Sequence, residues 1–162
     1  MDDDGNLPIH HLLQCRPFVN CNVIQQMVNI APTMCVQPTC QNKQNYPTKL
    51  PLYYAIQDHL DSTIRVLVEC YPESLTIAVD PKGRLPLHLA CINGKSSIIP
   101  LLIKHNPQAV RQHDNQNRLP IHYAANNLPD ISTEALQQLV NKWQDLCYKF
   151  CIEQDLTDSD NS

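Results

Sequence analysis

The chain has 162 residues, 43% hydrophobic and 17% charged, which is typical of one folded domain with a sizeable core. Its net charge of −4 disfavours a general nucleic-acid-binding surface, so we expect no nucleic-acid partner. The longest apolar run, IIPLLI, is too short to span a bilayer, and we expect no membrane insertion. The 13 prolines against 3 glycines indicate that proline recurs at one structural position.

The eight cysteines are consistent with a disulfide framework or with reduced thiols, depending on the compartment. The first residues, MDDDGNLPIH, lack the basic region and the apolar stretch of a secretory signal. Cys91 moreover stands where a small apolar residue is expected on a helix. We therefore expect reduced thiols and a cytoplasmic protein, with the nucleus as the alternative location.

A short phrase occurs four times along the chain. It reads LPIHHLL at 7–13, LPLYYAI at 50–56, LPLHLAC at 85–91 and LPIHYAA at 119–125. A second phrase, apolar at helical spacing, follows the first three copies and ends at Pro32, Pro72 and Pro107. The fourth copy, ALQQLVNKWQ, keeps the apolar spacing without the final proline. This recurrence indicates a repeat protein.

Each unit predicts two helices joined by a turn. Proline one residue inside the first helix suits its start, because the missing N–H would be unpaired there in any case. Proline after the second helix ends that helix. Pro100 should lie in the first turn of its helix or kink it. Between units, Gly83 and Asn117 occupy the same turn position, and both tolerate positive φ.

The predicted units cover about 2–36, 45–79, 80–113 and 114–152 within a single domain, 1–152. The first linker is longer than the later ones and predicts an irregular loop near 33–47. The last unit includes a helix over about 133–152 that contains Trp143. Residues 153–162 are expected to form an acidic disordered tail.

These units resemble the ankyrin repeat. The resemblance rests on the spacing of 35 and 34 residues between the last three copies, the Asp-x-x-Gly turn and the Pro-Leu-His-x-Ala phrase, and it is most specific at 80–125. It implies an all-α solenoid of helix-turn-helix units joined by β-turn or hairpin loops. It also implies a module that binds proteins and has no catalytic activity of its own.

Two departures from the family pattern are informative. Leucine replaces the usual threonine in every copy, at Leu7, Leu50, Leu85 and Leu119. The threonine hydroxyl caps the helix, and loss of a cap costs about 1 kcal/mol. Complete burial of leucine contributes roughly 1.5–3 kcal/mol, so we expect these leucines to pack against the adjacent hairpin. Leu12 replaces the small alanine, which predicts that the first unit packs less closely or lacks a neighbour on that side.

His88 and Cys91 are close enough in sequence to meet on one helical face. A Cys–His nucleophile, however, needs a third orienting group and an oxyanion site. Cys91 also corresponds to Ala125 and Ile56 in other units, which indicates a core position. We therefore expect no enzymatic activity.

Metal and cofactor binding have weaker support. Zinc prefers four ligands in close pairs, and the candidates are His10, His11, Cys15, Cys21, the widely spaced Cys35 and Cys40, and Cys147 with Cys151. His10 already has a structural explanation, because it is the repeat's motif histidine. No glycine-rich phosphate loop is present. We expect neither a metal nor a cofactor.

A row of cations is the most informative surface feature. Lys49, Arg84 and Arg118 precede three of the Leu-Pro pairs, and equivalent positions line up along a solenoid. Either the two arginines form solvated ion pairs of little energetic value with Asp80 and Asp114, or the row recruits an acidic partner. The resemblance places binding on the concave face of hairpins and first helices. The predicted partner-binding residues are Tyr46, Lys49, Gln57, Asp58, Lys82, Arg84, Ile92, Asn93, Gln116, Arg118, Asn126 and Asn127.

We therefore expect a monomeric protein-interaction module whose partner is a protein with an acidic surface. The alternative is a structural segment of a larger ankyrin-repeat scaffold with no partner of its own. A large apolar patch on the last unit would favour that alternative, because a terminal cap is polar outside.

Overall fold

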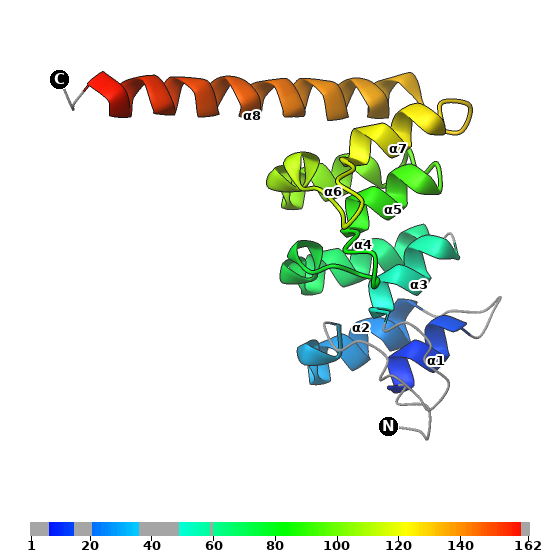
Figure 1. Ribbon diagram of the computed structural model, residues 1–162. Helices are drawn as coiled ribbons and strands as arrows, with labels where there is room; N and C mark the ends of the chain where they lie inside the picture. The colour runs from blue at the N-terminus through cyan, green and yellow to red at the C-terminus, as the bar shows by residue number, and fades with distance from the viewer. Residues whose placement is uncertain (1–6, 15–20, 36–48, 59, 160–162) are drawn as a thin grey trace.

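The computed structural model describes residues 7–14, 21–35, 49–58 and 60–159, and every regular element within these ranges is a helix. The helices stack in four pairs, from α1 at one end to α8 at the other (Figure 1). This arrangement confirms the predicted all-α solenoid. The pairs, in chain order, are α1 (Pro8–Gln14) with α2 (Cys21–Ile30), α3 (Pro51–Gln57) with α4 (Asp61–Cys70), α5 (Pro86–Ile92) with α6 (Ile99–His105), and α7 (Pro120–Asn126) with α8 (Thr133–Ser159).

The first helix of each pair begins at the predicted proline. The preceding Leu85 and Leu119 have extended backbones and provide no side-chain hydrogen bond to the helix. The motif histidine takes part in the cap instead. His88 Nδ1 accepts the Leu85 N–H at 3.1 Å, and His122 Nδ1 accepts the Leu119 N–H at 2.9 Å. The helix start is therefore stabilised by the histidine three residues later.

The leucines that replace threonine are buried where both neighbouring units are described. Leu50 is 2% exposed and Leu85 is 8% exposed, which confirms the burial predicted for them. The Leu50 N–H also donates to the Val79 carbonyl of the next hairpin, at 3.3 Å. Leu7 and Leu119 are half-buried. The hairpin after Leu7 lies outside the described residues, and no described hairpin follows Leu119.

The second helices end where proline prevents continuation. Pro72 and Pro107 do more than end α4 and α6, because each opens a short 3₁₀ helix. These are η2 (Pro72–Thr76) and η3 (Pro107–Arg111), and η1 (Pro32–Cys35) follows α2 in the same way. Pro100 lies in the first turn of α6, which is one of the two placements that the sequence allows.

The helix α8 has no proline in its sequence and runs for 27 residues, to Ser159. It extends well beyond the other helices of the stack (Figure 1). The sequence predicts an end near 152 followed by a disordered tail, whereas the backbone is helical through most of 153–162. Residues 160–162 lie outside the described part of the chain. No described helix is long and apolar enough to cross a membrane.

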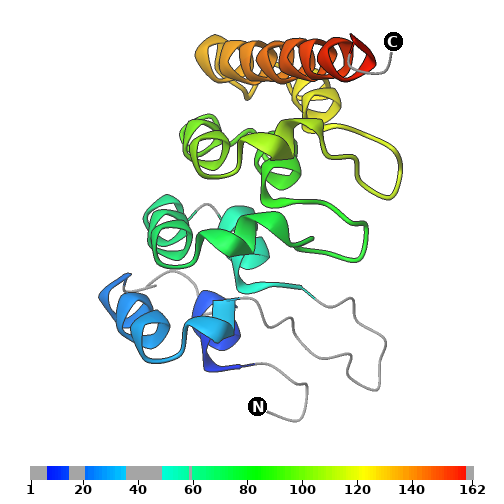
Figure 2. The same cartoon turned by 90° about the vertical axis from the view of Figure 1, so that its left-hand side faces the viewer.

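The turns between units project from one side of the stack (Figure 2). Gly83 has φ of 70° and Asn117 has φ of 58°, which confirms that both adopt the left-handed conformation expected of this position. Each closes a β-turn, because the Gly83 N–H donates to the Asp80 carbonyl at 3.1 Å and the Asn117 N–H to the Asp114 carbonyl at 2.9 Å.

Candidate partner-binding site

The hairpin of the third unit is held together by the carboxylate of Asp80. Its Oδ1 accepts the backbone N–H of Lys82 at 2.9 Å and that of Arg84 at 3.2 Å. Its Oδ2 accepts the Arg84 Nε–H at 2.6 Å, and a second guanidinium nitrogen of Arg84 completes a bidentate ion pair. The Asp80 side chain is 2% exposed and the Arg84 side chain 16% exposed. Arg84 is therefore largely occupied in stabilising its own turn.

The hairpin of the fourth unit repeats this design with one change. Asp114 Oδ1 accepts the N–H groups of Gln116 at 2.8 Å and Arg118 at 2.9 Å, and its Oδ2 accepts the Tyr123 hydroxyl. Burial acts to raise the pKa of Asp114, but these hydrogen bonds outweigh it and lower the pKa overall. The Arg118 Nε lies 3.9 Å from Oδ2, and the guanidinium lies over the Tyr123 ring, 4.5 Å from its centroid.

Arg84 and Arg118 thus pair with Asp80 and Asp114, but the aspartates are not solvated as the sequence suggested. The side chain of Asp114 is fully buried, like that of Asp80, because each carboxylate turns back to accept the N–H groups of its own turn. The aspartates therefore balance much of the charge of the two arginines. Lys49, Arg84 and Arg118 therefore do not offer a partner equal positive charge, because the two arginines are paired with aspartates.

Cationic side chains of two units meet in a pocket of 270 Å³. Lys49 stands just before α3, and its ammonium lies 4.2 Å from the centroid of the Tyr53 ring. Lys82 is exposed at the tip of the next hairpin. The pocket is lined by Lys49, Tyr53, Asp80, Pro81, Lys82 and Arg84. It brings together three of the predicted partner-binding residues, with an aromatic wall that the sequence did not single out.

Gln116 and Arg118 belong to the hairpin of the fourth unit. Six other predicted residues lie at the opposite end of the first helices, about 10 Å away, because each of these helices has seven residues. They are Gln57, Asp58, Ile92, Asn93, Asn126 and Asn127. Asp58, Asn93 and Asn127 are the C-caps of α3, α5 and α7. Asn127 Nδ2 also donates to the carbonyls of Ile92, at 2.9 Å, and Cys91, at 3.3 Å. Asn127 therefore joins the third and fourth units. Tyr46 lies outside the described residues, and the remaining exposed members are Gln57, Gln116 and Asn126.

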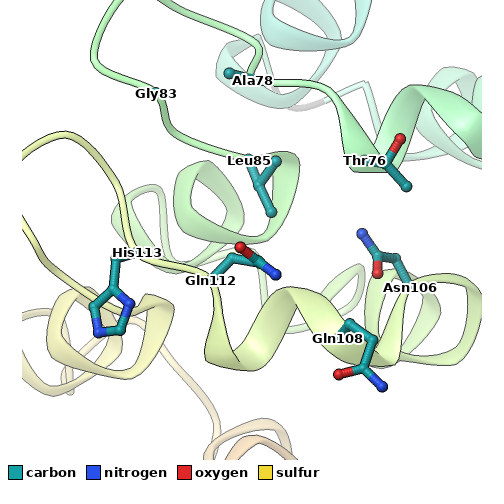
Figure 3. Close-up of a pocket in the computed structure, with 8 residues that line it drawn as sticks. All are labelled: Thr76, Ala78, Gly83, Leu85, Asn106, Gln108, Gln112 and His113. Carbon is teal, nitrogen blue, oxygen red and sulfur yellow. The ribbon is translucent and has the colours of Figure 1, made fainter.

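A larger pocket of 460 Å³ lies between the second and third units, where sequence reasoning expected no site. Figure 3 shows Leu85 beside Gln112, with Thr76, Asn106 and Gln108 around the same space. Asn106 Nδ2 donates to the Leu75 carbonyl at 2.8 Å. The lining is mostly neutral amide, hydroxyl and aliphatic groups, together with His113. It can form hydrogen bonds but supplies no carboxylate, lysine or arginine.

The His88–Cys91 pair has no arrangement for catalysis. Both residues are fully buried, and burial raises the pKa of the Cys91 thiol to about 12. His88 uses Nδ1 for the Leu85 cap, and its Nε2 lies 3.1 Å from the Arg118 carbonyl in the next unit. Both ring nitrogens are therefore used in structural contacts.

Possible metal ligands do not converge within the described ranges, where no cluster of three or more histidine, cysteine and acidic side chains could hold an ion. Cys21 contacts the Ser62 hydroxyl at 3.2 Å, and the thiol of Cys70 accepts a hydrogen bond from Gln25. Cys15 and Cys40 lie outside the described residues. The side chains of Cys35 and Cys151 are also outside the described part.

Four stacked units, each with a proline-started helix, a second helix and, in the later units, a projecting turn, define a helical-repeat solenoid. Residues 72–149 match the family model for ankyrin repeats in three copies. The fold is similar to the crystal structure of the ankyrin repeat domain of Bcl-3, a member of the IkappaB protein family. That match has a TM-score of 0.64 and 20% identity, and it covers 86% of this chain but only 57% of the Bcl-3 chain. Residues 72–149 are thus similar to ankyrin repeats, and the chain shares the fold of an ankyrin repeat domain.

Proposed function

We propose that this chain is a non-catalytic module that binds an acidic protein partner through its hairpin tips and first helices. Ankyrin repeats are generally protein-interaction modules, and no enzymatic family is indicated. The observation that carries the proposal is the pocket where Lys49, Tyr53 and Lys82 meet. Cys91 is fully buried in the core as a small apolar residue, which supports reduced thiols and a reducing compartment, the cytoplasm or the nucleus.

The chemistry of this pocket suits a carboxylate side chain. Two ammonium groups approach it from different units, while Asp80 is already committed to Arg84 and to its own turn. The Tyr53 ring offers an apolar wall for the methylene groups of a glutamate. Opposite charges across an interface mainly increase the rate and specificity of association.

The direct test is a binding titration with a fluorescein-labelled, glutamate-rich peptide. We expect Lys49→Glu/Lys82→Glu to weaken binding at least about tenfold at low salt, because two attractive contacts become repulsive. Arg65→Glu/Lys104→Glu is the matched control: it makes the same change in net charge at exposed positions on α4 and α6, away from the pocket, and should change affinity little. Equal weakening by both variants would show a net-charge effect only and would contradict the proposed site.

Reversing the charge of Arg84 is a poorer test than reversing the lysines. Replacing Arg84 would leave the buried Asp80 carboxylate without its ion-pair partner and would disturb the turn itself. Loss of binding could then reflect a damaged hairpin. The lysine variants avoid this ambiguity, since the hydrogen bond of Lys82 within the turn involves only its backbone N–H.

One observation favours the alternative role as a segment of a larger scaffold. Ala125 and Leu128 are exposed on the last unit, where a polar cap is expected. Ala125 occupies the position at which Ile56 and Cys91 are fully buried in the second and third units.

A further inference from the structure

Burial at the two ends of the stack identifies which repeat positions face each neighbour. We call the side toward α8 in Figure 1 the upper side. The first unit has a described neighbour only above it, so its fully buried residues mark the upper face. The fourth unit has a described neighbour only below it, so its buried residues mark the lower face. The upper positions are Ile9, His10 and Leu13 on α1 and Ile24 and Val28 on α2. The lower positions are Pro120 and Ala124 on α7 and Ala135 and Leu139 on α8.

The upper face of the fourth unit keeps the chemistry of a stacking surface. In the third unit, the corresponding Leu87, His88 and Cys91 are at most 1% exposed. Their counterparts in the fourth unit retain the apolar residues and the motif histidine, but none of them is fully covered. Ile121, Leu136 and Val140 are half-buried, and His122 and Ala125 are exposed. We call these five residues the upper end face.

The lower face of the first unit is apolar in the same way. The four lower positions of the fourth unit, on α7 and α8, correspond to two residues on α1 and two on α2. Pro8 is exposed and Val23 is 40% exposed, while Leu12 and Met27 are half-buried. We call these four residues the lower end face. Both ends of the stack therefore present the surface that internal junctions bury.

Residue size makes the two end faces complementary. At each of the three internal junctions, one residue on the upper face of a unit is larger than alanine, and the corresponding residue on the lower face of the next unit is alanine. Both residues are completely buried. The pairs are Leu13 with Ala55, Ile56 with Ala90, and Cys91 with Ala124. At the ends this order is reversed: the upper end face has Ala125, and the lower end face has Leu12. Between two copies, a large residue would again face a small one.

We propose that the upper end face of one copy binds the lower end face of a second copy, so that the helical stack continues across the junction. The second copy is the occupant because its Leu12 supplies the volume that Ala125 leaves open. His122 would become buried, as His88 is at the internal junction. Such a contact is heterologous and does not close, so association proceeds beyond dimers as concentration rises. This proposal differs from the monomer expected from the sequence.

Two blocking variants test the proposal. Ala125→Lys places a charge on the upper end face, and Val23→Lys places one on the lower end face; both positions are exposed helix sites that should tolerate lysine in the folded chain. Gln137→Lys and Gln26→Lys add the same charge at exposed positions outside these faces and serve as controls. Circular dichroism confirms folding, and sedimentation velocity up to about 1 mM reports association.

We expect the wild type and both controls to form species larger than dimers at high concentration. Each blocked variant alone should remain monomeric, whereas an equimolar mixture of Ala125→Lys and Val23→Lys should form a one-to-one dimer through the two intact faces. A monomeric wild type throughout the range would overturn the proposal. Dimerisation of Val23→Lys alone would also overturn it, because it would indicate a contact between two upper end faces. Continued association of both blocked variants would overturn it as well.

A size exchange tests the complementarity itself. Leu12→Ala should leave a cavity at the junction, and Ala125→Leu should overfill it, so each should reduce association. The double variant restores the internal arrangement, with the larger residue on the upper face of one copy and alanine on the lower face of the next, and should recover association toward the wild-type level. Additive losses in the double variant would show that these positions do not meet and would overturn the pairing.

Discussion

His88 uses both of its ring nitrogens to join two units. The Leu85 N–H donates to Nδ1, so the proton of the neutral ring is on Nε2, which faces the Arg118 carbonyl at 3.1 Å. Protonation would place a second hydrogen against the Leu85 N–H. Burial lowers the pKa of His88, and the charge of Arg84 acts in the same direction, against the opposing effects of the Arg118 carbonyl and the Asp114 carboxylate.

This environment predicts a stability change near neutral pH. Because the folded pKa lies below the ordinary histidine value of 6.5, the unfolded chain binds more protons once the pH falls below that value. Stability should therefore be complete above pH 6.5 and decline below it, by up to about 1.4 kcal/mol per pH unit. Urea unfolding at pH 7.5 and 5.5 measures this difference.

His88→Gln should reduce the pH difference. His122→Gln, at the equivalent but exposed position, should retain it. If both variants keep the wild-type difference, His88 is not its source.

For single residues, the sequence predicted which side chains form ion pairs better than it predicted how deeply these side chains are buried. The Asp80–Arg84 pairing could be predicted from the turn spacing, but the burial of the carboxylate depends on backbone N–H groups that only the folded turn directs toward it. The role of the motif histidine in capping follows the same pattern. Lys82 was among the residues predicted from the sequence to bind a partner, whereas its place in one pocket with Lys49 and Tyr53 depends on the packing of two units.

Elements were predicted well where one residue fixes the backbone. Proline marks the start of α3, α5 and α7, and the residues before Pro72 and Pro107 end α4 and α6. The 3₁₀ helices after these prolines were not predicted, because their short segments carry no periodic signal. The extension of α8 to Ser159 was also missed. Its acidic composition suggested a tail, but the segment has no proline or glycine to stop the helix.

The hairpin turns offer a matched pair of substitutions. Gly83 has φ of 70°, a conformation in which a Cβ is strained, and a Cβ there would also meet the end of the Asn115 side chain, so the main cost of Gly83→Ala is backbone strain. We expect it to lower the free energy of unfolding by about 1–3 kcal/mol. Asn117→Gly, at the equivalent turn position, should stay within about 1 kcal/mol of the wild type, because glycine adopts this conformation readily. Urea unfolding compares the two, and equal effects would contradict the strain argument.

For the whole molecule, the repeat spacing predicted the stacking order, because each unit exposes an apolar face that only another unit can cover. It did not predict the end faces. Leu12 was noted as a departure from alanine, but its complement Ala125 became meaningful only when burial showed which positions face up and which face down. The concave face remains the proposed binding surface, with its cations concentrated at one pocket rather than along a row.

Amide hydrogen exchange with and without the saturating glutamate-rich peptide tests the location of binding most directly. The account predicts slower exchange at 49–53 and 80–84, which contain the residues that line the cationic pocket. It predicts little change in α4 and α6, the second helices of the same two units. Slower exchange confined to α4 and α6, with the hairpin segment unchanged, would contradict the proposed binding face.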